Sequence, residues 1–270
     1  MNWIDAHCHL ADPRYDGKLD DVIRRSKEAN VYQWLQGGTC PEDWARQKQL
    51  RKTYGDGVLL SFGLHPWWVA RTCEKGAGSM LDTLANEASG AMAIGEVGLD
   101  GSSRFHGTEG LQREVFKAQL QLAKQCDKPV ILHVVKAHEA ALAALESVGP
   151  FPRGGMVHAF SESIVLAQKY WSLGFLISVG AAALRKDTAR EMVAHLPAEV
   201  LAIETDSPDQ LPTFLSLPAA SLNEPCYLVR IAEKVGELRS EPVEKVLATS
   251  SRNVRAMLGT LALLQEKHKE

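Results

Sequence analysis

The strongest constraint on the fold is an alternation of short apolar segments with longer amphipathic segments along the whole chain. The apolar segments have the length of strands and end at turn-forming or polar residues, whereas leucine, valine and isoleucine recur at helical spacing in the segments between them. Eight strands are predicted, one ending at His9 and the others over 31–35, 58–62, 91–97, 130–134, 155–160, 175–179 and 200–205.

Strands that alternate with helices form a parallel sheet with right-handed crossovers. The number of strands and the length of 270 residues fit a closed TIM barrel of the (β/α)8 type, a fold that takes ~250 residues. An open, doubly wound sheet is the alternative. No change in composition marks a second domain, so we predict one α/β domain over 1–260 and a solvated C-terminal tail over 261–270.

The composition is that of a soluble globular protein, with 45% hydrophobic and 23% charged residues. A net charge of −3 argues against a generally basic, nucleic-acid-coating surface, although it permits a local basic groove. No apolar run reaches the roughly 20 residues of a membrane span, and the start lacks a signal-sequence pattern. The five cysteines include no Cys-x-x-Cys pair. We therefore expect a cytoplasmic protein with reduced thiols and no membrane partner.

The first strand carries the sequence Asp5-Ala6-His7-Cys8-His9. Alternate side chains share a face of a strand, so His7 and His9 point the same way, about 7 Å apart along the strand. Two imidazoles in this arrangement can bind one metal ion from the same side. The motif alone is weak, because two structural histidines give the same pattern. Cys8 points the other way and is interpreted as a core thiol.

Further imidazole and carboxylate groups stand at the ends of other predicted strands, where a (β/α)8 barrel carries its active site. They are Glu96, His133, His158 and Asp206, from the fourth, fifth, sixth and eighth strands. Any one of them is explained as an ordinary polar residue at a strand end. Together with His7 and His9 they make six such residues at five strand ends, which that explanation fits poorly. We therefore predict a site for divalent ions such as zinc, magnesium or manganese.

Six ligands exceed the needs of one tetrahedral ion, so two ions that share a bridging carboxylate are the economical arrangement, and Glu96 is the predicted bridge. Two ions about 3.5–4 Å apart can activate a water molecule and neutralise an anionic transition state. Asp206 is predicted to hold a metal and to accept a proton from that water. Asp5 and Glu204 lie one pleat deeper and are predicted to orient the ligands, with a buried salt link as the alternative.

Seven motifs occur in order over residues 4–258: Asp5-x-His7-x-His9-Leu10, Gly63-x-His65-Pro66, Gly95-Glu96-x-Gly98-Leu99-Asp100, Pro129-x-x-x-His133, His158-x-Phe160-Ser161, Glu204-Thr205-Asp206-x-Pro208 and Asn223-x-Pro225. Together they resemble the signature of the TatD family of metal-dependent hydrolases. The resemblance implies an amidohydrolase-like TIM barrel, one or two divalent ions and deoxyribonuclease activity. By position it implies a substrate contact, to a phosphate, at His65, and metal ligands at His7, His9, Glu96, His133, His158 and Asp206.

Two positions depart from the family pattern, which commonly has arginine where this chain has Val135 and Leu222. An arginine fork binds phosphate with two parallel hydrogen bonds that an aliphatic side chain cannot replace. We therefore expect a weaker phosphate clamp. Other cations on or near these loops are candidates to compensate, although solvated surface charge is the simpler interpretation: Arg104, Lys136, Arg185 and Lys186.

A few remaining aromatic side chains are ambiguous. Trp67 and Trp68 follow His65 on a loop of the active face, where one of them either stacks on a base or packs over the barrel rim. His106 lies in the long loop over 101–110 that is expected above the site. Three further histidines are interpreted as surface residues: His138, His195 and His268.

These observations favour a metal-dependent deoxyribonuclease acting on DNA, on single-stranded ends or nicked strands. The missing arginines suggest an alternative, a metal-dependent hydrolase of a small ester, amide or phosphoester. A barrel that binds without catalysing is disfavoured because every proposed ligand is present. No obligate protein partner is implied.

Overall fold

The computed structural model describes residues 2–72, 74–218 and 220–259. The strands are β1 Trp3–Cys8, β2 Val31–Gln36, β3 Val58–Leu59, β4 Ser61–Phe62, β5 Ala93–Asp100, β6 Val130–Val135, β7 Gly155–Val157, β8 Phe175–Val179 and β9 Leu201–Ile203. The α-helices are α1 Leu19–Glu28, α2 Pro41–Tyr54, α3 Pro66–Val69, α4 Glu74–Glu87, α5 Glu109–Gln125, α6 His138–Val148, α7 Ile164–Trp171, α8 Asp187–His195, α9 Leu228–Arg239 and α10 Val243–Met257.

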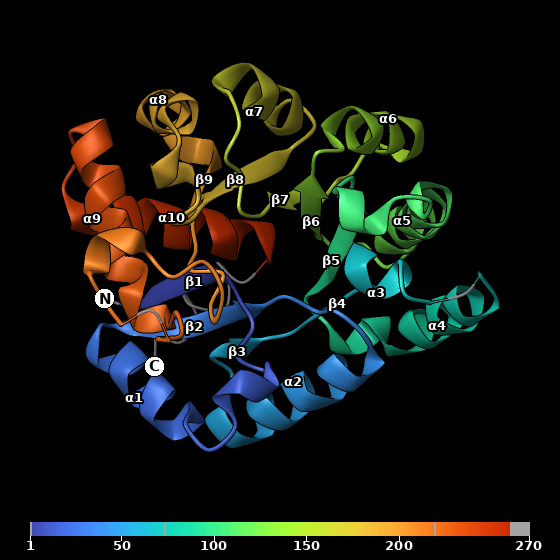
Figure 1. Ribbon diagram of the computed structural model, residues 1–270, viewed down its shortest axis with the longest axis horizontal. Helices are drawn as coiled ribbons and strands as arrows, with labels where there is room; N and C mark the ends of the chain where they lie inside the picture. The colour runs from blue at the N-terminus through green and yellow to red at the C-terminus, as the bar shows by residue number, and fades with distance from the viewer. Residues whose placement is uncertain (1, 73, 219, 260–270) are drawn as a thin grey trace.

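The strands pair in parallel and in chain order, from β1 to β3 and from β4 to β9. Leu60 separates β3 from β4, so the strand predicted over 58–62 is present in two pieces. The two ends of the strand order meet, because the amide of Asp206 donates to the carbonyl of His7 at 2.9 Å and that of His9 donates to Ser207 at 2.7 Å. Figure 1 shows the strands enclosed by a ring of helices. The predicted (β/α)8 barrel is confirmed, and a doubly wound sheet, whose strand order reverses, is excluded.

The interior of the barrel is filled by apolar side chains from the strands and from α10. This inner core consists of Ile4, Ala6, Leu35, Leu59, Ala93, Ile131, Met156, Ala202, Val254 and Met257. Helix α10 packs against β1 and β9, as Figure 1 shows, and its serine hydroxyls accept hydrogen bonds from the amides of Ile4 (to Ser251, 3.1 Å) and Ile203 (to Ser250, 2.8 Å). Because α10 closes the amino end of the barrel, the carboxyl end remains for the site.

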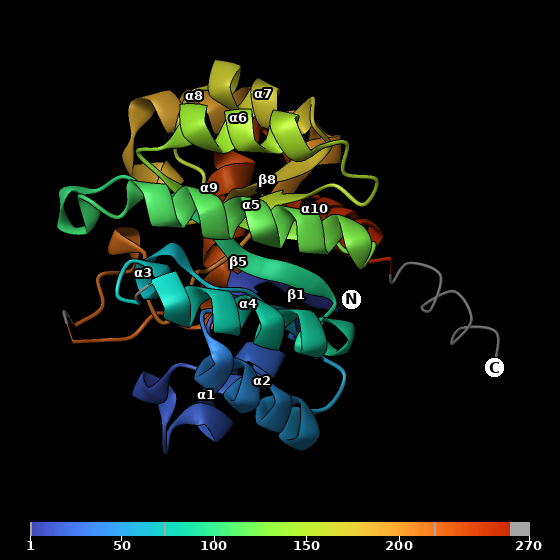
Figure 2. The same cartoon turned by 90° about the vertical axis from the view of Figure 1, so that its right-hand side faces the viewer.

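The outer helices position the loops at that carboxyl end. Helices α4, α5 and α6 run alongside one another on the outside of the barrel (Figure 2). Two buried glutamines of α5 reach the loops: Gln119 accepts from the amide of Leu64 at 2.7 Å, and Gln112 accepts from the amide of Asp100 at 2.8 Å. A single helix thereby fixes the chain beside His65 and the end of β5.

Two further predictions concern the rest of the chain. No helix within the described ranges is long and apolar enough to cross a bilayer. Cys8 is a buried free thiol in the core, as predicted, and three other described cysteines are also free: Cys40, Cys126 and Cys226. The predicted tail over 261–270 lies outside the described residues.

Candidate metal centre

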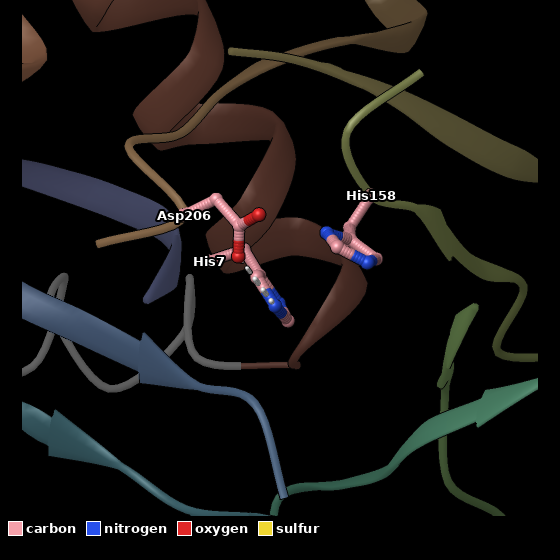
Figure 3. Close-up of side chains that lie close together, drawn as sticks. All are labelled: His7, His158 and Asp206. Atoms are coloured by element: carbon pink, nitrogen blue, oxygen red, sulfur yellow. Dashed lines mark ion pairs between the residues drawn. The ribbon is translucent and has the colours of Figure 1, made fainter. Parts of the chain in front are cut away.

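Five strand ends bring the six predicted ligands together at the carboxyl mouth of the barrel. His7 lies on β1 and His9 directly after it, Glu96 on β5 and His133 on β6. His158 is the first residue after β7, and Asp206 follows β9 by three residues. In Figure 3, His7, His158 and Asp206 approach one another from three separate segments. The barrel thus gathers four imidazoles and two carboxylates that are far apart in the sequence.

One group of atoms has the spacing of a tetrahedral site. The Nε2 atom of His7 lies 3.2 Å from Nε2 of His9 and 3.3 Å from Oε2 of Glu96. The Oδ1 atom of Asp206 lies 3.6 Å from His7 Nε2 and 3.4 Å from His9 Nε2, and the latter is 3.4 Å from Glu96 Oε2. Ligands bound at 2.0–2.1 Å at the corners of a tetrahedron are about 3.3–3.4 Å apart. His7, His9 and Glu96 therefore have the spacing of ligands to one ion, and Asp206 lies at a similar distance from both histidines.

A second group of atoms uses the other oxygen of the same carboxylate. Oε1 of Glu96 lies 2.8 Å from Nδ1 of His133 and 2.8 Å from Nε2 of His158, and these two nitrogens are 3.0 Å apart. Ligands at right angles around an ion, bound at the same length, are about 2.8–3.0 Å apart. The second group thus fits three adjacent positions of an ion with further positions open. Glu96 faces both groups, one oxygen to each.

Several buried atoms in the cluster have no hydrogen-bond partner. Oε2 of Glu96 is one, although its side chain is 2% exposed and two imidazole nitrogens face it. A buried carboxylate oxygen without a donor is costly unless a cation satisfies it. Imidazole nitrogen with carboxylate oxygen is a donor set that suits zinc and manganese. The residues therefore fit one or two divalent ions.

Gly37 constrains the group of ligand atoms from His7, His9 and Glu96. Its carbonyl lies 3.0 Å from Nδ1 of His9, which places the ring proton there and leaves the Nε2 lone pair facing the centre. A Cβ atom on Gly37 would lie 2.4 Å from Cε1 of His9, 2.7 Å from Cε1 of His7 and 2.8 Å from Oε2 of Glu96. Only glycine leaves room for the three ligands, a role that the sequence interpretation missed because it took Gly37 as a strand end.

Asp206 adopts a left-handed backbone conformation with φ of 54°. The side-chain amide of Gln210 donates to its Oδ2 atom, while Oδ1 faces the two histidines of β1. Burial raises the pKa of Asp206, but the imidazole of His9, 3.4 Å away, and the positive charges of nearby imidazoles outweigh burial and bring it to about 2. The carboxylate is therefore ionised at neutral pH.

The two carboxylates predicted to orient the ligands lie behind them. Asp5 accepts hydrogen bonds from the amide and the hydroxyl of Thr205, at 2.9 and 2.5 Å, and from the amide of His7 at 3.3 Å. Burial raises its pKa to about 8. Glu204 accepts from the amide of Ala159 at 2.7 Å and lies 3.6 Å from Nδ1 of His158. Asp5 thus joins β1 to the segment before Asp206, and Glu204 is placed to orient an imidazole.

His65 differs from the other histidines of the cluster. Its Nδ1 atom accepts a hydrogen bond from the amide of Trp67 at 3.0 Å, and its Nε2 atom lies 3.1 Å from Oε1 of Glu96. Burial lowers the pKa of His65 to about 4, so the ring is neutral, with its proton on Nε2. His65 is consequently a hydrogen-bond donor at the cavity wall and has no lone pair free for an ion.

Asp100, the last residue of β5, received no role from the sequence although it ends one of the motifs. Its Oδ2 atom accepts from the indole N–H of Trp67 at 2.5 Å and lies 3.8 Å from Nε2 of His133, while Oδ1 accepts from the amide of Ser102 at 2.8 Å. Burial would raise its pKa, but the nearby imidazole of His133 and the hydrogen bonds from Ser102 and Trp67 hold it below the usual range. Its position at a strand's carboxyl end was the signal.

A cavity of about 690 Å³ opens above the cluster. Its lining includes His9, His65, Trp67, Trp68, Glu96, His133, Val135, His158, Asp206 and two arginines, Arg14 and Arg71. Arg14 is held by Asp209 at 2.6 and 2.8 Å and by Asp12. Arg71 is exposed, and its side chain makes no hydrogen bond or ion pair with the described residues.

The four cations that were named as candidates to compensate for the missing arginines lie outside this lining. Lys136 lines a neighbouring groove, and Arg185 donates to the carbonyl of Leu211. Lys186 pairs with Glu162 at 3.1 Å. The guanidinium of Arg104 lies over the ring of Trp67. Of the two positions that depart from the family pattern, Val135 lines the cavity, whereas Leu222 packs against the core.

The remaining histidines contribute no ligand. His106 is 90% exposed and pairs with Glu109 on the loop surface. His195 is exposed, as predicted. The surface interpretation of His138 is wrong, because its half-buried ring packs beside Phe160 and its Nδ1 atom lies 3.0 Å from the hydroxyl of Tyr170. His268 lies outside the described residues.

A closed (β/α)8 barrel with imidazole and carboxylate groups at ligand spacing around its carboxyl mouth defines the class of metal-dependent barrel hydrolases. Residues 4–259 match the family model described as TatD related DNase. The chain belongs to this family. The resemblance seen in the sequence and the metal-dependent hydrolase class that it implied are thereby confirmed.

Comparisons with individual proteins support this family membership. The uncharacterized metal-dependent hydrolase YjjV of Escherichia coli is 32% identical over 90% of this chain and 93% of the relative. Its crystal structure matches with a TM-score of 0.84 at 29% identity, over 94% of this chain and 97% of the other. Human deoxyribonuclease TATDN3 is 29% identical, over 98% and 97% of the two chains. The 3'-5' ssDNA/RNA exonuclease TatD of Klebsiella pneumoniae is 33% identical, over 95% and 97%.

Proposed function

We propose that this protein is a metal-dependent deoxyribonuclease that hydrolyses phosphodiester bonds in single-stranded or end-bearing DNA. One or two divalent ions, zinc, magnesium or manganese, would be held by His7, His9, Glu96, His133, His158 and Asp206. The observation that carries the proposal is the meeting of two groups of ligand-spaced atoms at one buried carboxylate, Glu96. We include the whole of residues 1–260 in the hydrolase domain.

Bound divalent ions supply positive charge to phosphoryl oxygens and lower the pKa of water. Residues of the chain would position the ligands, accept a proton and bind the phosphate. Glu96 holds both groups of ligands in register through its two oxygens. Asp206 is ionised and lies at the cavity wall, so its carboxylate would accept the proton of an attacking water. The Nε2–H group of His65 would donate a hydrogen bond to a phosphate oxygen that reaches the cluster.

The choice of a DNA strand as substrate has two supports. Charge that develops on a transferring phosphoryl group is stabilised by the divalent ions that this donor set fits. The names of two relatives, deoxyribonuclease TATDN3 and 3'-5' ssDNA/RNA exonuclease TatD, point to nucleic acid and to single strands. We extend that preference to this chain and place the protein in the cytoplasm, in keeping with its free cysteines.

A second candidate substrate is a small phosphoester or ester. The cavity wall favours it at one point, since Val135 gives no phosphate contact and Arg14 is engaged by Asp12 and Asp209. A small substrate would need the metal ligands alone. The two candidates share the metal chemistry and differ only in whether nucleotides beyond the scissile bond add to binding.

The test uses the purified full-length protein, stripped of metal by a chelator and then supplied with Mg²⁺, Mn²⁺ or Zn²⁺ separately. Substrates are labelled single-stranded DNA, the matching duplex, RNA of the same sequence, and a panel of small esters and phosphoesters. The wild type is compared with Glu96→Gln and with Glu237→Gln, a control with the same chemical change at an exposed position of α9.

We expect cleavage of single-stranded DNA that needs added metal and falls by at least ~10³-fold in Glu96→Gln, because the loss of one charge uncouples both ligand groups. Glu237→Gln should match the wild type, and circular dichroism should show both variants folded. Full activity in folded Glu96→Gln would refute the assigned site. Hydrolysis of small esters without any cleavage of nucleic acid would replace DNA by the second candidate.

A further inference from the structure

The rim of the cavity carries an exposed indole directly beside the ligand cluster. Trp67 lies on the short helix α3, lines the cavity and is 37% exposed. Its ring centroid is 5.0 Å from that of His65 and 5.8 Å from that of His133, both in edge contacts. The hydrogen bond from its Nε1 atom to Asp100 fixes the plane of the ring. The indole is therefore held in a fixed orientation, in contact with His133, one of the predicted metal ligands.

The loop after β5 adds a cation and a second ring to this position. The guanidinium of Arg104 lies 4.7 Å from the ring centroid of Trp67 and 5.1 Å from that of Phe105. The rings of Trp67 and Phe105 are stacked, with centroids 6.0 Å apart. Phe105 is buried, so it supports the group from within. Arg104 is exposed and forms no ion pair within the described ranges, so its charge is available to an anion.

We propose that Trp67, backed by Phe105 and flanked by Arg104, is a nucleotide subsite that stacks the base adjacent to the scissile phosphate. The inference rests on the proposed function and names how the substrate is held. Stacking on an aromatic ring is the sequence-tolerant way in which proteins bind single strands, because every base has a π face, and a guanidinium near the ring adds attraction for the strand's phosphates. The occupant is a base of an unpaired strand, since a base inside a duplex has no free face.

The neighbouring tryptophan differs in a way that singles out Trp67. Trp68 is only partly exposed and packs against the main hydrophobic core. The two possibilities left open by the sequence, base stacking and packing over the rim, are thus divided between the two residues: Trp68 packs, and Trp67 presents its ring. This subsite would also bind the strand without the arginine that is common in the family at the position of Val135.

One other explanation for any effect of Trp67 must be separated from stacking. Because its indole N–H donates to Asp100, which faces His133, removal of the ring would also release a contact to a predicted metal ligand. Trp67→Phe removes the N–H but keeps an aromatic face, whereas Trp67→Ala removes both. Loss through Asp100 would affect the two variants and all substrates equally, while loss of stacking depends on the ring and on the base.

The experiment measures kcat/KM on short single-stranded trinucleotides in which each base in turn is replaced by an abasic residue. We expect that one abasic position costs the wild type about tenfold, within the range of one base stack. Trp67→Ala should lose about tenfold on the intact trinucleotide but little on that abasic one, and Trp67→Phe should lose less than Trp67→Ala. Metal content, measured on the same samples, should be unchanged.

Equal losses for Trp67→Ala on intact and abasic substrates would overturn the subsite and leave the proposed nuclease standing. A drop in metal content, or identical losses in Trp67→Phe and Trp67→Ala, would show instead that the residue acts through Asp100. If the wild type cleaves no trinucleotide with any of the three metals, the proposed function and the subsite both fall.

Discussion

The floor and the rim of the cavity are built in different ways. The floor consists of strand residues and of residues one to three positions beyond a strand, and there His7, Glu96 and His133 face one another at ligand spacing. The rim consists of loop residues, of the short helix α3 and of Val135 at the end of β6, and its arginines are either engaged, as Arg14 is, or at the exposed edge, as Arg71 is. The floor carries a dense set of metal-binding groups, whereas the rim has few groups that would bind a phosphate.

Because floor and rim differ in this way, we expect the chemistry and the substrate preference of this barrel to depend on separate parts of the chain. A ladder of hydrogen-bonded strands fixes the floor, so a change there disturbs the whole ligand set. The rim follows loop conformations, and a change there alters contacts one by one. We therefore expect large losses from substitutions in the floor and small, substrate-dependent effects from substitutions in the rim.

The largest effect in the floor that leaves every ligand in the sequence is expected from Gly37→Ala. The added Cβ would lie 2.4–2.8 Å from atoms of His9, His7 and Glu96, so these side chains must move. A misplacement of about 1 Å in a catalytic group can cost about 10²-fold in rate. We expect a loss of at least this size in kcat, with fewer metal ions bound per chain by elemental analysis.

The matched control is Gly78→Ala on α4, where a Cβ would meet no atom within 4 Å. It should leave activity unchanged and raise thermal stability slightly, because alanine favours a helix over glycine by up to about 1 kcal/mol. Wild-type metal binding and activity in Gly37→Ala would mean that the ligands do not need the geometry described for the floor.

The same division explains how much of the molecule could be predicted from the sequence. The alternation of elements gave the barrel, and β8 occupies residues Phe175–Val179, as predicted. Strand β5 extends to Asp100, beyond the predicted end at 97, because Leu99 and Asp100 continue to pair with Val134 and Val135 of β6. Pairing between strands is a tertiary contact that local patterns do not contain.

In the site, the sequence placed the residues that belong to strands and missed those whose contacts arise from loops. His133 and Glu96 could be predicted to converge because the carboxyl ends of barrel strands share one face. Asp100 carried the same signal at the end of β5, but its contact with Trp67 could not be predicted, and neither could Gln210 nor the network of Arg14, since each contact depends on the path of another loop. The preferred interpretation of Lys186, a surface charge, agrees with its exposed pair with Glu162, although that partner was not predicted.

An intermediate effect is expected where the floor meets the rim, at Asp100. Asp100→Asn keeps an acceptor for the indole N–H of Trp67 but removes the negative charge that faces His133 at 3.8 Å. Loss of such an outer partner of a metal-binding histidine typically costs 10–100-fold in metal affinity or activity. We expect a loss in this range that excess metal partly restores, measured by titrating activity with Mn²⁺. Asp56→Asn, at an exposed position, is the control.

If Asp100→Asn lowered activity equally at all metal concentrations, its role would lie with the substrate rather than with His133. If it had no effect, the distance of 3.8 Å would mark mere proximity. Either result would mean that Asp100, at the end of β5, does not connect the rim to the metal ligands of the floor.

The smallest effect, and the one gain, is expected in the rim from Val135→Arg. The side chain of Val135 lines the cavity two residues after His133, so a guanidinium there would reach substrate phosphate. An exposed ion pair contributes up to about 1 kcal/mol, which corresponds to about fivefold in binding. We expect KM for single-stranded DNA to fall by about this factor at low salt, with kcat little changed and a steeper dependence on salt. Leu222→Arg offers the contrast, because Leu222 packs against the core and a charge there would destabilise the fold without improving binding. Should Val135→Arg leave KM and its salt dependence unaltered while the wild type cleaves DNA, the strand would pass the cavity on another side, and Trp67 with Arg104 would mark that path.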